Sequence, residues 1–381
     1  MEVVVTGIGL LCALGESLWT SWSRLIAGES AIALHHPFPE LPPTPLAPIA
    51  VSPTPLAPLT ETTIATALKD ANLVPPLPDC AVAIGSSRSH QGRWEQLARQ
   101  FYRHPNPPRE SLIPDNWLDT LPHMPAIATA RSLGSTGPVF APMAACATGI
   151  WAIAQGVQLI QSGHCQRAIV GAVEAPITPL TLAGFAKMGA LAKTGCYPFD
   201  RDRQGLVLGE GAAAFVLESA ELAHQRGAKI YGKILSFGLT NDACYGNAPD
   251  QSGTAAIAAI LQSLTRAHLS PSDIDYIHAH GTSTQLNDCT EARIIQHLFP
   301  PGVPVSSTKG ATGHALGASG ALGTAFCLMA FHQGHLPPCV GLQNPAFDLD
   351  FVTTSRRTNP ERVLCFSFGF GGQNAVLALG K

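Results

Sequence analysis

Short apolar runs alternate with longer amphipathic stretches along most of the chain. The apolar runs have the length and composition of buried strands. They cover residues 2–11, 80–84, 139–143, 167–173, 212–217, 229–237, 274–279, 303–307 and 362–368. Helical spacing of apolar residues marks a second set of segments. These cover residues 17–27, 61–71, 147–161, 254–267, 288–298 and 317–333. Strands that alternate with helices predict a layered α/β architecture.

Two stretches break this alternation. Residues 37–58 are dense in proline and contain the sequence PTPLAP twice, at 43–48 and 53–58. Proline excludes a regular helix or an inner strand there, so we expect an extended surface excursion. Residues 90–122 are polar, aromatic and interrupted by proline, which favours a helical cap over another part of the fold.

Composition narrows the class of protein. With 46% apolar and 13% charged residues, the 381-residue chain can bury a large core. A formal charge of −3 gives no reason to expect nucleic-acid binding. The ten cysteines show no CxxC pair, which is typical of free thiols in a reducing cytoplasm. The uncharged run 315–331 is short and interrupted by glycine, so we predict a buried helix and no membrane insertion.

The segment PMAACATGIW, residues 142–151, places Cys146 between a buried strand and an Ala-rich helix. Free N–H groups and the positive end of the helix dipole at such a turn favour a thiolate without a dedicated base. Gly149 allows another helix or a ligand to approach closely. The alternative is a small buried cysteine of no chemical role.

The segment HAHGTSTQLNDCTE, residues 278–291, follows an apolar strand. His280 therefore lies at the carboxyl end of a strand, where α/β proteins bind ligands. Thr282 and Thr284 add hydroxyls suited to a polar, amide-bearing chain. Asp288 is expected to cap the next helix. His278 would point to the opposite side of the strand, and we interpret it as structural.

The segment SSTKGATGHALGASGA, residues 306–321, repeats the strand–turn–helix pattern and carries His314. Two neutral imidazoles that each offer an Nε2–H can hold a carbonyl oxygen while an enolate forms. Lys309 is the expected buried cation, with Asp288 and Glu291 as candidate partners. Zinc ligation by the histidines is the alternative, but there is no HExxH motif and no third spaced ligand.

Two glycine-rich segments remain. In FSFGFGGQNAV, residues 366–376, the aromatic and glycine positions argue against an ordinary strand. A turn lined by Phe368 and Phe370 suits a mobile gate, or a backbone N–H aimed at an oxyanion. The GEG of residues 209–211 is too short for a phosphate loop, so a structural role is expected there.

Together with the opening VVVTGIGLLCALG, residues 3–15, and PFDRDRQGLVLGEGA, residues 198–212, these blocks resemble the β-ketoacyl synthases of fatty-acid and polyketide assembly, in the family's order from Val3 to Ala375. The resemblance is to the elongating type, which condenses acyl- with malonyl-carrier protein. It implies a thiolase-like five-layered αβαβα fold in a single unit, residues 1–381, built from two similar halves. Residues 1–228 would carry the nucleophile and residues 229–381 both histidines. It also implies a homodimer and a ping-pong cycle.

The resemblance also implies roles for individual residues. Cys146 would accept the acyl chain, and the N–H groups of Cys146 and Phe370 would form the oxyanion hole. His280 and His314 would promote decarboxylation of the malonyl group and stabilise the enolate. Thr282 and Thr284 would contact the phosphopantetheine arm of the carrier protein. Phe370 would gate the acyl pocket, with Phe368 beside it, and no metal or redox cofactor would be required.

Three positions depart from the family pattern. Gly323 stands where fatty-acid elongating enzymes usually carry Glu, Gln373 changes the usual GFGGTN, and Tyr245 replaces a common histidine. These departures keep a polyketide-type ketosynthase open as an alternative. A coenzyme A thiolase would need a second catalytic cysteine, for which Cys365 is the candidate. A non-catalytic chain-length subunit would lack the nucleophile that this chain has.

Carrier proteins are acidic, so a basic docking patch is expected near the mouth of the site. Residues 25–68 contain no lysine or arginine, so this part of the chain cannot supply such a patch. The candidates are cations elsewhere in the chain. They are Arg99, Arg103, Arg109, Arg131, Lys187, Arg201 and Arg203.

Overall fold

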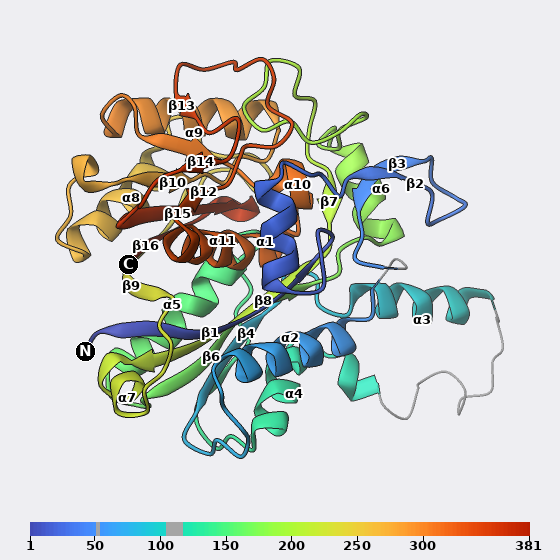
Figure 1. Ribbon diagram of the computed structural model, residues 1–381. Helices are drawn as coiled ribbons and strands as arrows, with labels where there is room; N and C mark the ends of the chain where they lie inside the picture. Colours follow the sequence, from blue (N-terminus) through green and yellow to red (C-terminus); the bar gives the residue numbers. More distant parts are fainter. Residues whose placement is uncertain (51–53, 104–116) are drawn as a thin grey trace.

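The structure is a computed structural model that describes residues 1–50, 54–103 and 117–381 (Figure 1). Eleven of its strands form one mixed sheet, in the order β13-β11-β10-β15-β16-β9-β1-β8-β6-β4-β5. The first part of the chain supplies β1 Val3–Cys12, β4 Ala81–Gly85, β5 Val139–Phe140, β6 Arg167–Glu174 and β8 Gly211–Ser219. The second part supplies β9 Gly232–Asn241, β10 Tyr276–His278, β11 Pro304–Ser306, β13 Asp350–Phe351, β15 Arg362–Gly369 and β16 Gln373–Gly380.

The two parts of the sheet repeat one topology. Read towards the centre of the sheet, the first is β5-β4-β6-β8-β1, and the second, which begins inside the edge strand β13, is β11-β10-β15-β16-β9. The first three strands of each series are parallel, and the remaining pairings are antiparallel in both. The series meet where Val3–Val5 of β1 pairs with residues 232–234 of β9. We propose the boundary between the two halves at residues 228 and 229, just before β9.

Helices complete five layers (Figure 1). The helices are α1 Leu18–Ile26, α2 Leu56–Asp70, α3 Gln91–Arg103, α4 Met124–Leu133, α5 Thr148–Gln161, α6 Pro179–Lys187, α7 Ala220–Gln225, α8 Thr254–Arg266, α9 Gln285–Leu298, α10 Lys309–Thr312 and α11 Ser319–Gln333. α5 and α11 pack against each other between the two parts of the sheet, with α2 and α4 outside the first and α8 and α9 outside the second. The predicted five-layered αβαβα fold is therefore confirmed.

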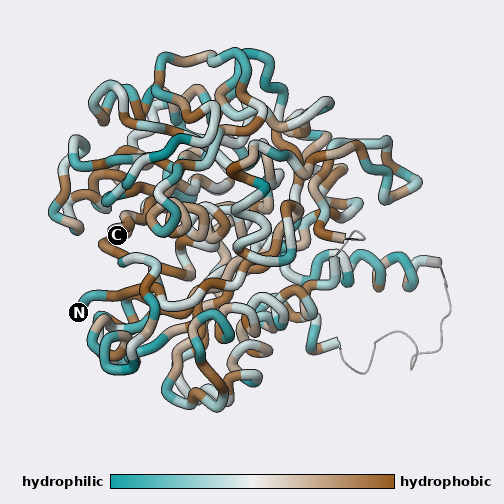
Figure 2. Tube along the Cα trace, viewed as in Figure 1, coloured by the Kyte–Doolittle hydropathy of each residue, from teal (hydrophilic) through white to brown (hydrophobic). Residues whose placement is uncertain are grey.

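Close approach of the two central helices depends on one glycine. A Cβ at Gly149 of α5 would lie 2.6 Å from the backbone nitrogen of Ala321 in α11, closer than any real contact. The largest apolar cluster lies around these two helices, and separate clusters lie under the outer helices. In Figure 2 hydrophobic residues follow the strands, while hydrophilic residues are common in outer loops and along α3.

The proline-rich stretch is more regular than the sequence predicted. Its residues Thr44–Ala47 form β3, the middle strand of a small sheet between β2 Ala33–His35 and β7 Leu208–Gly209. The expectation that no inner strand occurs here was wrong, because a strand of four residues tolerates Pro45 where no ladder bond is needed. α2 also begins inside the stretch, at Leu56 rather than Glu61.

The glycine-rich segment 366–376 lies in a hairpin rather than a long loop. β15 continues to Gly369 and β16 begins at Gln373, so only the short turn Phe370–Gly372 lies outside the strands. β16, α4, α6 and α7 were not among the predicted elements. The expected cap over residues 90–122 includes α3 and the short helix Trp117–Thr120, while its residues 104–116 lie outside the described residues.

A last pair of short strands, β12 His335–Leu336 and β14 Arg356–Arg357, forms a separate two-stranded sheet. Among the helices that the structure describes, none combines the length and the apolar composition needed to cross a bilayer. α11 contains the uncharged run from residue 319 onward, and it is buried along nearly its whole length.

Candidate active site

Cys146 lies in the turn between β5 and α5. The residue before it, Ala145, has a φ of 46°, a left-handed conformation that is strained for a residue with a Cβ. The Thr148 hydroxyl holds this turn, because it accepts from the N–H of Ala144 at 2.9 Å and donates to the Ala145 carbonyl at 2.7 Å. From the other half of the fold, the Ser367 hydroxyl donates to the Cys146 carbonyl at 2.8 Å. The nucleophile candidate is thus fixed from both halves.

The surroundings of the thiol favour its protonated form. Burial raises the pKa of Cys146 to about 11, although Lys309, Arg88 and a hydrogen bond from the Phe370 N–H each lower it. The expectation of a thiolate at neutral pH was therefore wrong. Burial, which the sequence pattern could not measure, outweighs the favourable charges and donors.

His280 follows β10, where the chain turns at Gly281 with a φ of 41°. Glu291 of α9 holds this turn, since its carboxylate accepts from the N–H of His280 at 2.6 Å and of Gly281 at 2.7 Å. Lys309 donates to the His280 carbonyl, and its Nζ lies 3.5 Å from Nδ1 of the ring. An ammonium group offers only donors, so Nδ1 is the acceptor and the ring proton is on Nε2.

His314 is held by β7 and by the start of α11. Its N–H donates to the Val207 carbonyl at 2.7 Å, and its carbonyl accepts from the Gly209 N–H at 3.1 Å. Its Nδ1 lies 2.8 Å from the Ser319 hydroxyl. Within the described part of the chain this buried hydroxyl has no other hydrogen-bond partner, so its proton is used by Nδ1. His314 therefore also carries its ring proton on Nε2.

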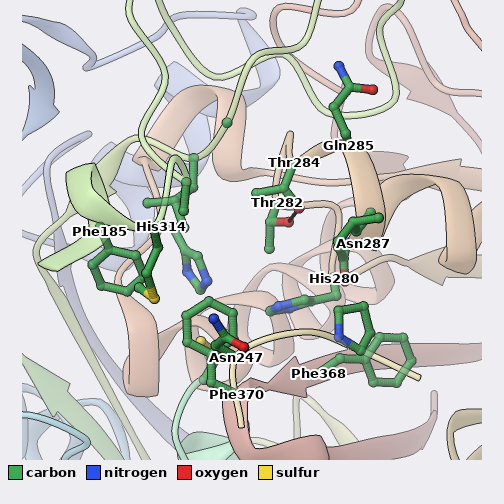
Figure 3. A pocket seen from close by; sticks show the side chains of 18 of the residues that line it. Phe185, Asn247, His280, Thr282, Thr284, Gln285, Asn287, His314, Phe368 and Phe370 are labelled. Atoms are coloured by element: carbon green, nitrogen blue, oxygen red, sulfur yellow. Dashed lines mark hydrogen bonds between the residues drawn. The ribbon is translucent and has the colours of Figure 1, made fainter. Parts of the chain in front are cut away.

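The imidazoles of His280 and His314 lie close together, with their rings nearly perpendicular (Figure 3). Their ring centroids are 5.4 Å apart with an interplanar angle of 80°. One nitrogen of each ring and the Cys146 sulphur all lie within 4.8 Å of one another. Burial, followed by the charge of Lys309, holds the pKa of both histidines well below the usual value. The site therefore presents two neutral N–H donors next to a thiol.

The same three atoms also have the spacing of a metal site. A metal would need the Nε2 lone pairs, which requires moving each ring proton to Nδ1. For His280 that proton would then face the Lys309 ammonium at 3.5 Å. The donor arrangement fits a carbonyl oxygen better than a cation, so the absence of a metal role stays our prediction, with this support.

Cys146, His280 and His314 lie at a cavity of about 240 Å³. Thr282, Thr284, Phe368 and Phe370, all predicted site residues, line the same cavity (Figure 3). The hydroxyls of Thr282 and Thr284 are hydrogen-bonded to each other at 2.9 Å. Phe370 stacks on Phe185 of α6, and Phe368 packs its edge against His280.

The supporting acidic residues are arranged differently from the prediction. Asp288 does not cap α9 or pair with Lys309. Its carboxylate accepts from the N–H groups of Phe199 at 2.8 Å and Ser283 at 3.1 Å, and Arg203 lies 3.8 Å from it. Glu291 holds the backbone rather than the lysine, because Lys309 has no carboxylate within salt-bridge distance in the described residues. Burial raises the pKa of Glu291 to about 7.

Sequence reasoning missed Glu174, at the end of β6. The two oxygens of this buried carboxylate accept hydrogen bonds from the N–H groups of Ser87, Arg88 and Gly317, at 2.8 to 3.0 Å. They also accept from two serine hydroxyls. A glutamate that ends an apolar strand was the available signal. Phe185 and Ser319 were also missed, and nothing in their local sequence distinguishes them.

The departure at Gly323 has a structural reason. A Cβ there would lie 2.7 Å and 2.8 Å from ring atoms of His278 and 3.1 Å from the Cys365 sulphur. The His278 ring points away from the cavity and hydrogen-bonds to Thr308 at 3.1 Å. It fills the space that a side chain at position 323 would need. Tyr245 is exposed and does not line the cavity, and nothing in the structure explains Gln373.

The candidate docking cations differ in how available they are. Arg203 is buried and held by Asp288 and by the Asp200 carbonyl, so it is not available for docking. Arg99 is exposed but paired with Glu40. Arg131, Lys187 and Arg201 are exposed. Arg109 and the side chain of Arg103 lie outside the described residues.

Comparison with protein families gives two consecutive matches. The family model for the N-terminal domain of β-ketoacyl synthases matches residues 50–223, and the model for the C-terminal domain matches residues 231–343.

Among curated proteins, the chain is 42% identical over 267 residues to 3-oxoacyl-[acyl-carrier-protein] synthase 2 of Synechocystis sp., covering 66% of this chain and 64% of the relative. It is 32% identical to the mitochondrial 3-oxoacyl-[acyl-carrier-protein] synthase of Arabidopsis thaliana, covering 99% of this chain and 92% of the relative.

Among solved structures, a type II polyketide ketosynthase in complex with its acyl-carrier protein and bound to the hexaketide is similar over the whole chain. The TM-score is 0.94 at 27% identity, and the match covers 100% of this chain and 99% of the other.

Proposed function

The chain belongs to the β-ketoacyl synthase family and is a 3-oxoacyl-[acyl-carrier-protein] synthase, an acyltransferase; from that premise we propose the residues that perform each step. The observation that carries the proposal is the position of the Cys146 sulphur within 4.8 Å of one nitrogen of both His280 and His314. A nucleophile and two carbonyl-directed donors are the groups that a Claisen condensation of thioesters requires.

In the first half-reaction Cys146 takes the acyl group. Its sulphur attacks the thioester carbonyl of the acyl-carrier protein, and the N–H groups of Cys146 and Phe370 stabilise the oxyanion. The sulphur–carbonyl bond of the donor breaks, and the leaving thiolate takes up the proton that Cys146 gives up. The Phe370 N–H already donates to the Cys146 sulphur, which supports this assignment.

In the second half-reaction the two histidines act on the malonyl thioester. The Nε2–H groups of His280 and His314 hold its carbonyl oxygen while the bond to the carboxylate breaks and carbon dioxide leaves. The electron pair of that bond forms the enolate, which attacks the acyl carbon on Cys146. The 3-oxoacyl product leaves, and the Cys146 thiolate is reprotonated from solvent.

The thioester arm enters past Thr282 and Thr284, whose hydroxyls suit the amides of phosphopantetheine. We propose an acyl-carrier protein as the partner, since the relatives named above use one and the related polyketide ketosynthase is seen with one. The docking site is then the exposed surface near the cavity mouth, where Lys187 lies next to the exposed lining residue Met188.

We propose a homodimer with β5 at its centre. β5 is the last strand of the large sheet, and Phe140 in it is 41% exposed. On the adjacent face of α5, Trp151 Nε1 and Gln155 Oε1 are buried without a hydrogen-bond partner in the described residues. An unpaired strand edge beside orphaned polar atoms suits a second copy of the chain. Sedimentation of a Phe140→Asp variant as a monomer would support this interface.

The cytoplasmic location stays a proposal. It rests on ten cysteines that are all free in the structure. Two of the relatives of this chain are named as mitochondrial proteins, so fractionation of the source cells is the direct test.

Intact mass spectrometry tests the mechanism. Wild type is incubated with acyl-carrier protein, beside Cys146→Ala, and malonyl-carrier protein is then added. We expect an acyl adduct on wild type only, which malonyl-carrier protein discharges as 3-oxoacyl product. An adduct that also forms on Cys146→Ala would place the nucleophile elsewhere, and the nine other cysteines would be mapped by peptide mass.

A polyketide-type ketosynthase is the second candidate. Two observations favour it. The structure is similar to that of a polyketide ketosynthase, with a TM-score of 0.94 at 27% sequence identity, and Gly323 stands in place of the usual Glu. The same assay separates the two, because a polyketide enzyme keeps extending a chain whose 3-oxo groups have not been reduced.

A further inference from the structure

The loop after β4 matches the loop that carries His280. β4 holds the same place in the first series of strands that β10 holds in the second. In the second half Glu291 accepts from the N–H groups of His280 and Gly281. In the first half Glu174 accepts from the N–H groups of Ser87, at 2.8 Å, and Arg88, at 2.9 Å. Arg88 is therefore held at the active-site end of its strand by the same device as His280.

The Arg88 side chain is a cation with no anionic partner among the described residues. It is half-buried, and it makes no salt bridge or side-chain hydrogen bond with any residue that the structure describes. Its guanidinium carbon lies 5.8 Å from the centroid of the Phe185 ring. Arg88 has no nitrogen among the buried side-chain atoms that lack a hydrogen-bond partner, so its donors are left to water.

Phe185 connects this cation to the gate of the acyl pocket. Its ring stacks on Phe370 with centroids 5.8 Å apart and an interplanar angle of 30°. Phe185, Leu182 and Ile177 belong to the apolar cluster that also contains Cys146. The charge of Arg88 also lowers the pKa of Cys146, which places it within electrostatic reach of the thiol. An acyl chain on Cys146 that displaces Phe370 would then approach Phe185 and Arg88.

We propose that Arg88 determines acyl specificity, and that it selects chains with an oxygen acceptor at their far end over plain alkyl chains of equal length. The proposal rests on the proposed function, because it assumes that Cys146 carries the acyl group. An alkyl end placed against the guanidinium would remove water from it without replacing the hydrogen bonds. A carboxylate or oxo oxygen would supply the missing acceptor, and a carboxylate would do so with two parallel hydrogen bonds.

The test measures loading of Cys146 with small thioesters that lack a carrier protein. Acyl groups with a methyl end and with a carboxylate end are compared as N-acetylcysteamine thioesters, in pairs such as octanoyl and octanedioyl, over a range of lengths. The readout is the rate of the mass increase on Cys146. Because these donors have neither carrier protein nor phosphate, a docking role of Arg88 cannot change the result.

We expect wild type to load the best carboxylate-ended donor about tenfold faster than its alkyl partner, as for a hydrogen bond to a charged group. In Arg88→Met the preference should reverse, with alkyl loading about threefold faster than in wild type. Arg93→Met is the matched control, since Arg93 is an exposed cation on α3 in the same segment. It should keep the wild-type preference.

Each outcome has one meaning. Alkyl loading that equals carboxylate loading in wild type at every length, or a preference that survives in Arg88→Met, would overturn the role of Arg88 while leaving the proposed function intact. No loading by any donor, in a protein with wild-type circular dichroism, would overturn the proposed function as well. A loss of loading with all donors in Arg88→Met would make the residue structural.

Discussion

The two halves of the molecule share a scaffold and differ in what the scaffold holds. Both use one strand order, and both fix the loop after the second strand of that order with a buried glutamate, Glu174 in one half and Glu291 in the other. The first half places a thiol in the turn before its central helix. The second half places a histidine there and inserts α10, which brings in Lys309. The two halves therefore share their backbone scaffold, whereas the thiol comes from one half and the histidines come from the other.

That division has an electrostatic reason. Lys309 contributes to depressing the pKa of both histidines and keeps the proton of His280 on Nε2. It also lowers the pKa of Cys146, although burial still holds that pKa at about 11. One buried cation in the second half thus acts on the thiol and on both imidazoles, whereas no described residue of the first half is hydrogen-bonded to a nitrogen of either ring.

The largest expected effect separates the two half-reactions. His280→Ala and His314→Ala should lose condensation by about a thousandfold, the usual effect of removing a donor to an oxyanion. Both should still form the acyl adduct on Cys146 within about threefold of wild type. His278→Asn, which alters a histidine outside the cavity, is the control. The measurements are intact mass for the adduct and release of labelled carbon dioxide for condensation. Loss of the adduct in the histidine variants would contradict the division.

The paired glutamates sharpen the comparison. Glu291→Gln sets an amide N–H against one of two backbone N–H groups and should displace His280, slowing condensation by about a hundredfold. Glu174→Gln should instead slow acyl loading by a similar factor. Separate rates for the two half-reactions, with thermal unfolding as the check on folding, give the answer. If both variants slow the same step, Glu174 and Glu291 do not support separate half-reactions.

The pKa of Cys146 predicts a pH dependence of alkylation. Only the thiolate reacts with iodoacetamide, and its fraction rises about tenfold per pH unit as long as the pH lies below the pKa. With a pKa of about 11, the rate at Cys146 should rise in this way from pH 7 to pH 10. Peptide mass mapping follows Cys146, with the exposed Cys244 as the reference. A plateau below pH 8 would restore the thiolate expected from the helix dipole.

The smallest expected effect concerns the packing of the second half. Gly323→Ala places a methyl group 2.7 Å from the His278 ring and should destabilise the fold by about 1–3 kcal/mol. The apparent unfolding temperature should fall by a few degrees, and His278→Ala in the same chain should recover part of it. An additive double variant would mean that the two residues do not compete for space.

The sequence predicted the reactive residues better than their support. Cys146, His280 and His314 each follow an apolar strand through a turn of small residues, which is a local signal that a single sequence contains. The five layers could likewise be expected once the blocks resembled a known family. β16 was missed because its glycine-rich start was interpreted as a loop rather than as the turn of a hairpin.

The errors concern contacts between distant segments. Asp288 and Glu291 lie one helical turn apart, and sequence offered both as partners of Lys309. In the folded chain one accepts from the N–H of Phe199 and the other from those of His280 and Gly281. Arg203 was a candidate for docking in the sequence, but in the structure its side chain is buried beside Asp288. The thiolate expectation failed for a similar reason, because burial depends on what packs around a turn.

The narrow pairing between β1 and β9 has a consequence for the speed of turnover. Because Val3–Val5 joins the two parts of the sheet and α5 packs on α11 behind them, neither half can swing as a rigid body without opening the core. Substrate entry is then left to the short Phe370–Gly372 turn. That turn is attached to residues 241–246 by the hydrogen bonds Asn241 to Gly371, 2.8 Å, and Gly371 to Gly246, 2.9 Å. Loop rearrangements of this size take microseconds to milliseconds. The rate of substrate entry is then set by the motion of a few residues rather than by the motion of a domain.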